Sequence, residues 1–251
     1  MTRRAAAALG LLAAFALAGP GATDLAERKK QLILDAFFGA VGARADVDAA
    51  TREKILAMRE GAVLVGEYSC IHQALLLLYD EYRRADALLL NERYAGAAEA
   101  FGRLQGSSDP YLAAYAKYRY GLAELNREQF EKAAAAFTSV LNEHPREAGC
   151  DVEAAFYRAI ALGQSRDKEN ALVASMRFLE DYPDAPERYR QAMEQMLNEL
   201  LQEWESPLYD LSGRMGKAAR VIEGGDTGTN AQGEQREIVS ILDELIKQAE
   251  A

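Results

Sequence analysis

The chain is poor in proline, which interrupts helices, and in histidine and cysteine, which often bind zinc. Its 251 residues include 6 prolines, 2 histidines and 2 cysteines. Few prolines leave room for long helices, and runs of β-branched residues with period-2 alternation, which would indicate a sheet, are missing. Cys70 and His72 lie two positions apart, so in a helix they face different ways, whereas zinc needs three or four convergent ligands. We therefore predict an all-α protein without a metal or other cofactor.

Long apolar runs and excess positive charge are also missing. After the N-terminal segment, no stretch reaches the roughly 18 apolar residues of a membrane-spanning helix, and the longest apolar cluster ends at Asp80 and Glu81. The chain carries 39 acidic and 29 basic residues. Such a charge balance repels nucleic acid and anionic lipid headgroups. We expect no stable membrane insertion and no nucleic-acid partner.

The N-terminus has the features of a secretory signal peptide. Arg3 and Arg4 precede a run of small apolar residues from Ala5 to Ala18, and small residues suited to cleavage follow. The run is too short for a permanent membrane helix, and no cysteine is present for a lipid anchor. We predict a signal peptide over residues 1–22 and a periplasmic or secreted product.

The two cysteines leave two interpretations open. In an oxidising compartment, Cys70 and Cys150 would close a loop of about 80 residues, which stabilises the fold by roughly 4 kcal/mol in the chain-entropy model. Alternatively, both are buried thiols that pack as small apolar residues. The sequence does not choose between them.

A repeated pattern of small residues and prolines runs through the middle of the chain. Ala97, Ala133 and Ala171 lie 36 and 38 residues apart, and Pro145 and Pro183 each follow the corresponding alanine by 12 residues. A small residue allows two helices to approach closely, and a proline ends a helix. The pattern predicts helix–turn–helix units of about 36 residues that stack in series.

Two further features support this periodicity. Twelve residues before each of these alanines stands another small residue, namely Ala85, Gly121 or Ala159. The segments at 140–145 and 178–183 also share their pattern of apolar, acidic and aromatic residues before the final proline. The small residues Ala85, Gly121 and Ala159 predict a second close contact in each unit, in the preceding helix.

These residues resemble the tetratricopeptide repeat (TPR) family. The resemblance covers about residues 75–185 and suggests the exported bacterial type, such as the Tol–Pal-associated and outer-membrane-assembly TPR proteins of the envelope. It implies a solenoid of about three helix pairs that binds other proteins. The second unit carries the clearest match, through Tyr120-Gly121-Leu122-Ala123, Phe130-Glu131-Lys132-Ala133, Phe137 and Pro145.

Helical segments flank the repeats on both sides. We expect an N-terminal helical cap over 23–65, in which Asp46 or Asp48 caps the second helix. The repeat region with its own capping helix is expected over 66–204, and a helical hairpin over 205–251. The apolar stripe expected on the first cap helix consists of Leu32, Ile33, Ala36, Phe37 and Val41.

No catalytic motif stands in a suitable context. Asp226-Thr227-Gly228 matches the aspartic-protease triplet, but it lies in a glycine-rich segment between two predicted helices rather than between strands. The same segment lacks the lysine and the spacing of a phosphate-binding loop. We therefore predict that the protein is not an enzyme.

Aromatic residues recur on the first helix of each unit. In the TPR-like register they fall near the concave groove, where tyrosine suits peptide recognition. Tyr115 and Tyr118 belong to a stripe of 3–4 spacing, which is equally typical of a buried core face. Both interpretations stay open. The candidate partner-binding residues are Tyr79, Tyr82, Tyr115, Tyr118, Glu153 and Phe156.

The leading functional hypothesis is an exported scaffold or adaptor that binds a peptide or helix of an envelope protein. One alternative is a structural homo-oligomer that assembles through the C-terminal hairpin. Another is an accessory of a cell-wall enzyme. Repeat architecture alone does not identify the partner.

Overall fold

The computed structural model describes residues 21–64, 69–144, 149–165, 167–205, 211–212, 215–216, 219 and 229–249, and across these the chain is helical with no strand. The predicted all-α class is therefore confirmed. The predicted signal peptide lies almost entirely outside the described residues, as does the glycine-rich segment with the Asp226 triplet. The helices are α2 (Gly21–Ala43), α3 (Ala49–Ala57), α4 (Cys70–Leu78), α5 (Asp80–Leu90), α6 (Tyr94–Leu104), α7 (Pro110–Asn126), α8 (Phe130–Glu143), α9 (Asp151–Gln164), α10 (Lys168–Asp181), α11 (Glu187–Glu205) and α13 (Thr229–Ala249).

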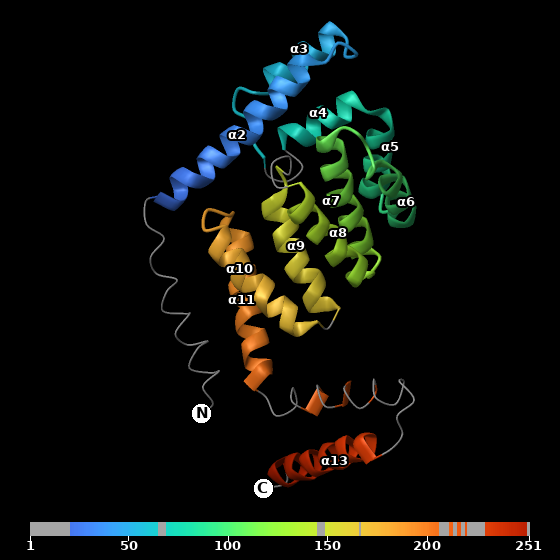
Figure 1. Ribbon diagram of the computed structural model, residues 1–251, viewed down its shortest axis with the longest axis vertical. Coiled ribbons are helices and arrows are strands. Elements are labelled where there is room, and N and C mark those ends of the chain that lie inside the picture. Colours follow the sequence, from blue (N-terminus) through green and yellow to red (C-terminus); the bar gives the residue numbers. More distant parts are fainter. Residues whose placement is uncertain are drawn as a thin grey trace. The chain divides into compact units, whose positions relative to one another are not determined.

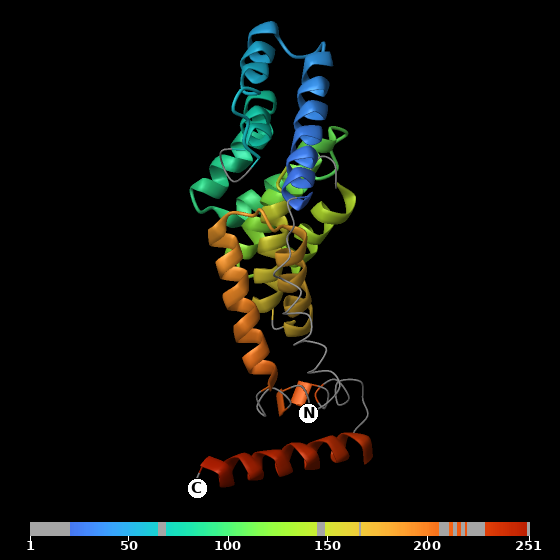
Figure 2. The ribbon, with the colours of Figure 1, turned by 90° about the vertical axis from the view of Figure 1, so that its left-hand side faces the viewer.

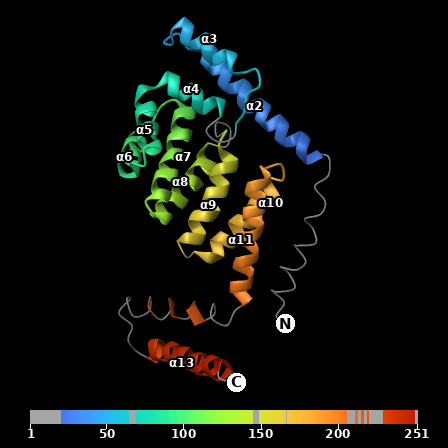
Figure 3. The same ribbon diagram turned by 180° about the vertical axis from the view of Figure 1, so that it is seen from behind.

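The chain divides into two compact units, residues 1–194 and 195–251. In the first unit, the helices from α5 to α10 pack in chain order, each against the next (Figure 1). The first helices of neighbouring pairs also touch, α5 against α7 and α7 against α9. Figure 3 shows the same order from behind.

The three helix pairs share the same internal turn. The amide of Arg93 donates to the carbonyl of Leu88, that of Gln129 to Glu124, and that of Asp167 to Leu162. Each bond spans five residues, as in the Schellman ending of a helix. Two of the turns place a glutamate at positive φ, Glu92 at 58° and Glu128 at 60°. These turns are also 36 and 38 residues apart, so the spacing seen in the sequence corresponds to a repeated backbone geometry.

The small residues of the repeat lie where the helices approach most closely. Ala85, Ala97, Ala133, Ala159 and Ala171 are fully buried. At Gly121 of α7, an added Cβ would lie 2.7 Å from the ring of Phe137 on α8, so only glycine fits this contact. The close approach inferred from the sequence is therefore present in the packing.

The N-terminal helices form an antiparallel arm. Helices α2 and α3 run side by side (Figure 2), and Asp48, one of the two predicted caps, accepts the amide of Thr51 at 3.0 Å. The predicted stripe on α2 is wrong at Leu32, which is 71% exposed, and at exposed Ala36. The buried face is rotated by about one residue and consists of Ile33, Leu34, Phe37, Phe38 and Val41.

The arm is attached to the repeats by aromatic and ionic contacts. Phe37 of α2 meets Tyr111 of α7 edge to face, with ring centroids 5.0 Å apart. Arg44, just after α2, donates to the Tyr79 hydroxyl at 2.6 Å and contacts the Asp109 carboxylate at 3.3 Å. Asp109 also caps α7 through the amides of Tyr111 and Leu112. One carboxylate thus begins a helix and helps attach the N-terminal arm.

In the second unit, α13 is an amphipathic helix with a partly exposed apolar face. Val239, Leu242 and Ile246 are 56%, 39% and 53% exposed. Their spacing of three and four residues places them on one side of the helix. In the part of the chain that the structure describes, no helix is long and apolar enough to cross a membrane.

Candidate functional site

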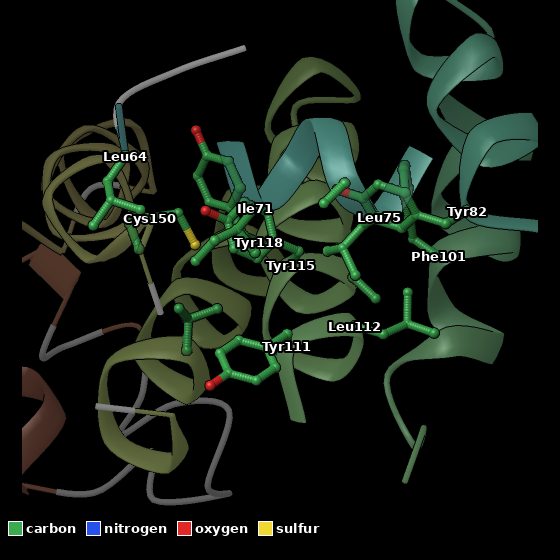
Figure 4. Packing of buried hydrophobic residues seen from close by; sticks show 14 of the residues in the cluster. Leu64, Ile71, Leu75, Tyr82, Phe101, Tyr111, Leu112, Tyr115, Tyr118 and Cys150 are labelled. Atoms are coloured by element: carbon green, nitrogen blue, oxygen red, sulfur yellow. The ribbon is translucent and has the colours of Figure 1, made fainter. Parts of the chain in front are cut away.

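Most of the aromatic residues expected to form a partner-binding groove lie in the core. Tyr82, Tyr115 and Tyr118 are 0%, 1% and 7% exposed, and Glu153 is 1% exposed. Figure 4 shows the three tyrosines among the buried apolar side chains, together with Ile71 and Cys150. A partner has no access to these residues in this structure, in keeping with the core interpretation.

The other two predicted residues are partly exposed but engaged within the protein. The hydroxyl of Tyr79 donates to the Asp109 carboxylate at 2.5 Å, and the guanidinium of Arg44 lies 5.2 Å from its ring centroid. Phe156 stacks on Tyr189 of α11 with centroids 4.5 Å apart and meets Phe178 edge to face. Tyr79 therefore joins the arm to the repeats, and Phe156 joins the third pair to α11.

A polar cluster is buried among these tyrosines. Nη2 of Arg119 lies 2.7 Å from Nε2 of His72, and Nδ1 of His72 lies 2.9 Å from the Tyr82 hydroxyl. Asp86 lies beside both side chains, with Oδ1 3.5 Å from Arg119 Nε and Oδ2 3.7 Å from His72 Nε2. The hydroxyls of Ser69 and Tyr115 form a further contact at 2.6 Å.

Hydrogen-bond chemistry fixes the protonation of His72. Arginine only donates, so Nε2 of His72 accepts and Nδ1 carries the proton that it donates to Tyr82. Burial lowers the pKa of His72 to about 3, and the charge of Arg119 acts in the same direction. The residues of this cluster are at most 5% exposed, so it holds α4, α5 and α7 together without facing a ligand.

Both cysteines are buried free thiols in the structure. The residues next to them in sequence, Gly149 and Ile71, lie close together, since a Cβ on Gly149 would lie 3.1 Å from the Cδ1 of Ile71. Burial raises the pKa of Cys70 to about 11 and that of Cys150 well above its ordinary value. Their thiols pack as apolar groups, and the disulfide stays a prediction.

An open cleft of about 840 Å³ is the best candidate for a binding site. It lies between α2, the segment after α3, the start of α9 and the α10–α11 connection, and Figure 3 shows the N-terminal half of α2 near that connection. Its apolar lining comes from Ile33, Val63, Leu64, Val152, Pro183, Ala185 and Pro186.

The local sequence explains why this surface stays open. Pro183 and Pro186 end α10 and precede α11, so the connection cannot continue either helix. Gly149 also lines the cleft and packs closely there, since an added Cβ would be 2.9 Å from Leu64 Cδ2. The break between α10 and α11 therefore leaves this surface uncovered by a continuous helix.

The charged lining of the cleft is mainly acidic. Five carboxylates and two ammonium groups line it: Glu27, Asp151, Glu180, Asp181 and Asp184, with Lys29 and Lys30. Asp151 is the first residue of α9, where the helix dipole favours a negative charge. The field in the cleft therefore favours cations over anions.

Within the cleft, one cation already has a defined position. The ammonium of Lys29 pairs with the Asp151 carboxylate and lies 5.9 Å from the ring centroid of Tyr182. Burial raises the pKa of Tyr182, and the Asp151 and Asp181 carboxylates raise it further, so the ring stays neutral. A carboxylate and an aromatic ring together form a seat for a cation.

No sequence pattern predicts this cleft. Lys29 and Asp151 are separated by 122 positions, and no periodic pattern connects them. Tyr182 stood out only as the residue before a helix-ending proline. A clearer signal would have been the pair of prolines, 183 and 186, with four acidic residues from 180 to 187 around an aromatic.

Comparison of the chain with protein-family models, with curated proteins and with solved structures finds no match. Among the residues that the structure describes, no group of three or more His, Cys, Asp or Glu side chains is arranged to hold a metal ion.

Proposed function

We propose that the protein is an exported scaffold of the bacterial cell envelope, built on TPR-like repeats, that binds a peptide or helix of a partner protein. The single observation that carries this proposal is the open cleft between α2 and the α10–α11 connection. A volume of about 840 Å³ with an apolar base and a charged rim is typical of a binding surface. Binding of a peptide or helix accounts for this combination of apolar and charged lining residues.

The repeat geometry supports the scaffold interpretation. Three helix pairs with the same turn pack in series, as in helical repeat proteins that bind partners. Helix α2 and the α10–α11 connection supply the cleft with further walls beside the start of α9. Walls that belong to packed helices lower the entropy cost of binding because little of the site must be ordered.

Photo-crosslinking in cells tests this function. A photoreactive phenylalanine analogue would replace Val63 or Asp184, which line the cleft, and in controls Leu90 or Val173, which are 61% and 46% exposed elsewhere. We expect the same discrete protein adduct from both cleft positions and not from the controls. Equal adducts at all four positions, or none in the cleft, would contradict the proposal.

A second candidate, a homo-oligomer assembled through the C-terminal helices, is favoured by the exposed apolar face of α13. Val239, Leu242 and Ile246 together form the kind of stripe that a partner helix covers. The mass of the full chain in solution, compared with that of Val239→Ser/Leu242→Ser, tests it. A multiple of the 27.5 kDa chain that falls to the monomer in the variant would support it. A monomeric full chain would exclude it.

A further inference from the structure

The Lys29–Asp151–Tyr182 contact places a cation against a carboxylate and an aromatic ring inside the cleft. Asp151 is mostly buried, with its side chain 14% exposed, whereas the Lys29 side chain is 50% exposed. The carboxylate and the ring are thus fixed parts of the wall, and the ammonium reaches them from α2 on a long aliphatic stem. Asp151 and Tyr182 together form the cation seat, and Lys29 of the same chain occupies it.

We propose that the cleft recognises a peptide segment in which an arginine or lysine is flanked by apolar residues, and that this cation displaces Lys29 from Asp151 and Tyr182. The inference rests on the proposed function and names the chemistry of the partner. The apolar flanks would lie against Leu64, Val152 and Pro183, and the acidic rim would surround the cation.

Displacement of Lys29 costs little because the Lys29 side chain is half-exposed. Ion pairs with a half-exposed partner contribute little, since water and side-chain entropy offset the attraction. An incoming guanidinium makes two parallel hydrogen bonds to a carboxylate and stacks on a tyrosine ring, which an ammonium does not do. Lys29 therefore acts as a weak internal competitor that keeps Asp151 paired when the cleft is empty.

The charge balance of the rim favours a cationic occupant over an acidic one. After Lys29 leaves the seat, the five carboxylates Glu27, Asp151, Glu180, Asp181 and Asp184 still face the site. An acidic segment would bring like charges together in a half-enclosed space, which disfavours it. An apolar segment without a cation would leave Lys29 in place and use only the base of the cleft.

Selection from a random dodecapeptide library displayed on phage tests both the scaffold function and the recognition of a cation. The target is the chain without the predicted signal peptide, and parallel selections use its Asp151→Asn and Asp35→Asn variants. The second variant removes an exposed carboxylate of α2 that pairs with Arg59 outside the cleft, so it controls for net charge. The thermal unfolding midpoint of each variant reports that it is folded.

We expect the wild type and Asp35→Asn to enrich peptides with one arginine or lysine between apolar residues. The tightest arginine peptide is then synthesised with citrulline, its neutral isostere. Citrulline or Asp151→Asn should weaken binding about tenfold or more. Lys29→Gln should tighten binding several-fold, while Lys54→Gln on α3, a basic residue outside the cleft, should not.

Each outcome has a distinct meaning. Enriched peptides that contact the cleft without a cation, or that tolerate citrulline, would overturn the cation seat and leave the scaffold function standing. No enrichment above an empty support would contradict the scaffold function itself. Peptides that bind Asp151→Asn and wild type equally would place recognition away from this seat and overturn the inference.

Discussion

At the scale of single residues, His72 shows how completely burial and hydrogen bonding fix a side chain. It lies between Arg119 and Tyr82 and is 2% exposed. It stays neutral because Nε2 must accept the hydrogen bond from Arg119 while Nδ1 donates to Tyr82. A histidine with a depressed pKa makes stability depend on pH. The unfolded chain binds a proton below its ordinary pKa near 6.5, whereas the folded chain does not until about pH 3.

The direction of this effect follows from the two pKa values. Stability from neutral His72 is fully present above about pH 6.5 and declines by about 1.4 kcal/mol per pH unit as the pH falls below it. We expect the free energy of unfolding to fall more steeply between pH 7 and 5 in the wild type than in His72→Gln, as measured by urea denaturation. Parallel pH profiles would show that His72 titrates normally.

Thiol reactivity tests the state of Cys70 and Cys150. Because both are buried with raised pKa values, neither forms the reactive thiolate readily at neutral pH. Ellman's reagent should label neither in the native protein and both in urea without a reductant. Absence of labelling in urea until a reductant is added would instead demonstrate the disulfide.

At the scale of helices, the contact between α7 and α8 depends on a single glycine. In Gly121→Ala the new methyl group would lie 2.7 Å from the fully buried ring of Phe137. We expect destabilisation of about 1–3 kcal/mol from overpacking, despite the better helix propensity of alanine.

Gly102 provides the matched control for this substitution. It lies in α6 with nothing within 4 Å of an added Cβ, so Gly102→Ala should stabilise by about 0.5–1 kcal/mol. Unfolding free energies from chemical denaturation measure both. Stabilisation by both substitutions would show that α7 and α8 are not packed so closely.

The shared turns between paired helices supply a second test at this scale. Glu92 and Glu128 adopt φ of 58° and 60°, a conformation that glycine adopts without steric cost. Glu92→Gly and Glu128→Gly should each stabilise by about 0.5–1 kcal/mol. Ala135→Gly, at an exposed position inside α8, should destabilise by about 1 kcal/mol. If all three substitutions destabilise equally, the turns do not have this backbone geometry.

At the scale of the whole molecule, the sequence reveals contacts that repeat and misses those that occur once. Ala97, Ala133 and Ala171 predict close helix packing because the same requirement recurs at 36 and 38 residues. The register of α2 was missed at Leu32, since a single amphipathic helix does not show which neighbour covers it. The buried state of Tyr82 and Tyr115 depends on α4 and α7, which no local pattern positions.

The cleft was missed for a related reason. Its cation seat combines Lys29 of α2, Asp151 of α9 and Tyr182 after α10, which only the packing of the N-terminal arm brings together. Charged residues on helices are common and are usually solvated, so none of the three stands out in the sequence. The repeat predicts a scaffold, and the tertiary structure supplies the candidate binding surface.

Hydrogen exchange of the full chain, with and without the tightest library peptide, shows where the peptide binds. We expect slower exchange in the N-terminal half of α2, in the first turn of α9 and around Tyr182, with the rest of the repeat region unchanged. The matched Asp151→Asn protein should lose most of this protection at the same peptide concentration. Protection confined to α13, or to the outer faces of α5 and α6, would contradict the claim that this cleft is the binding site.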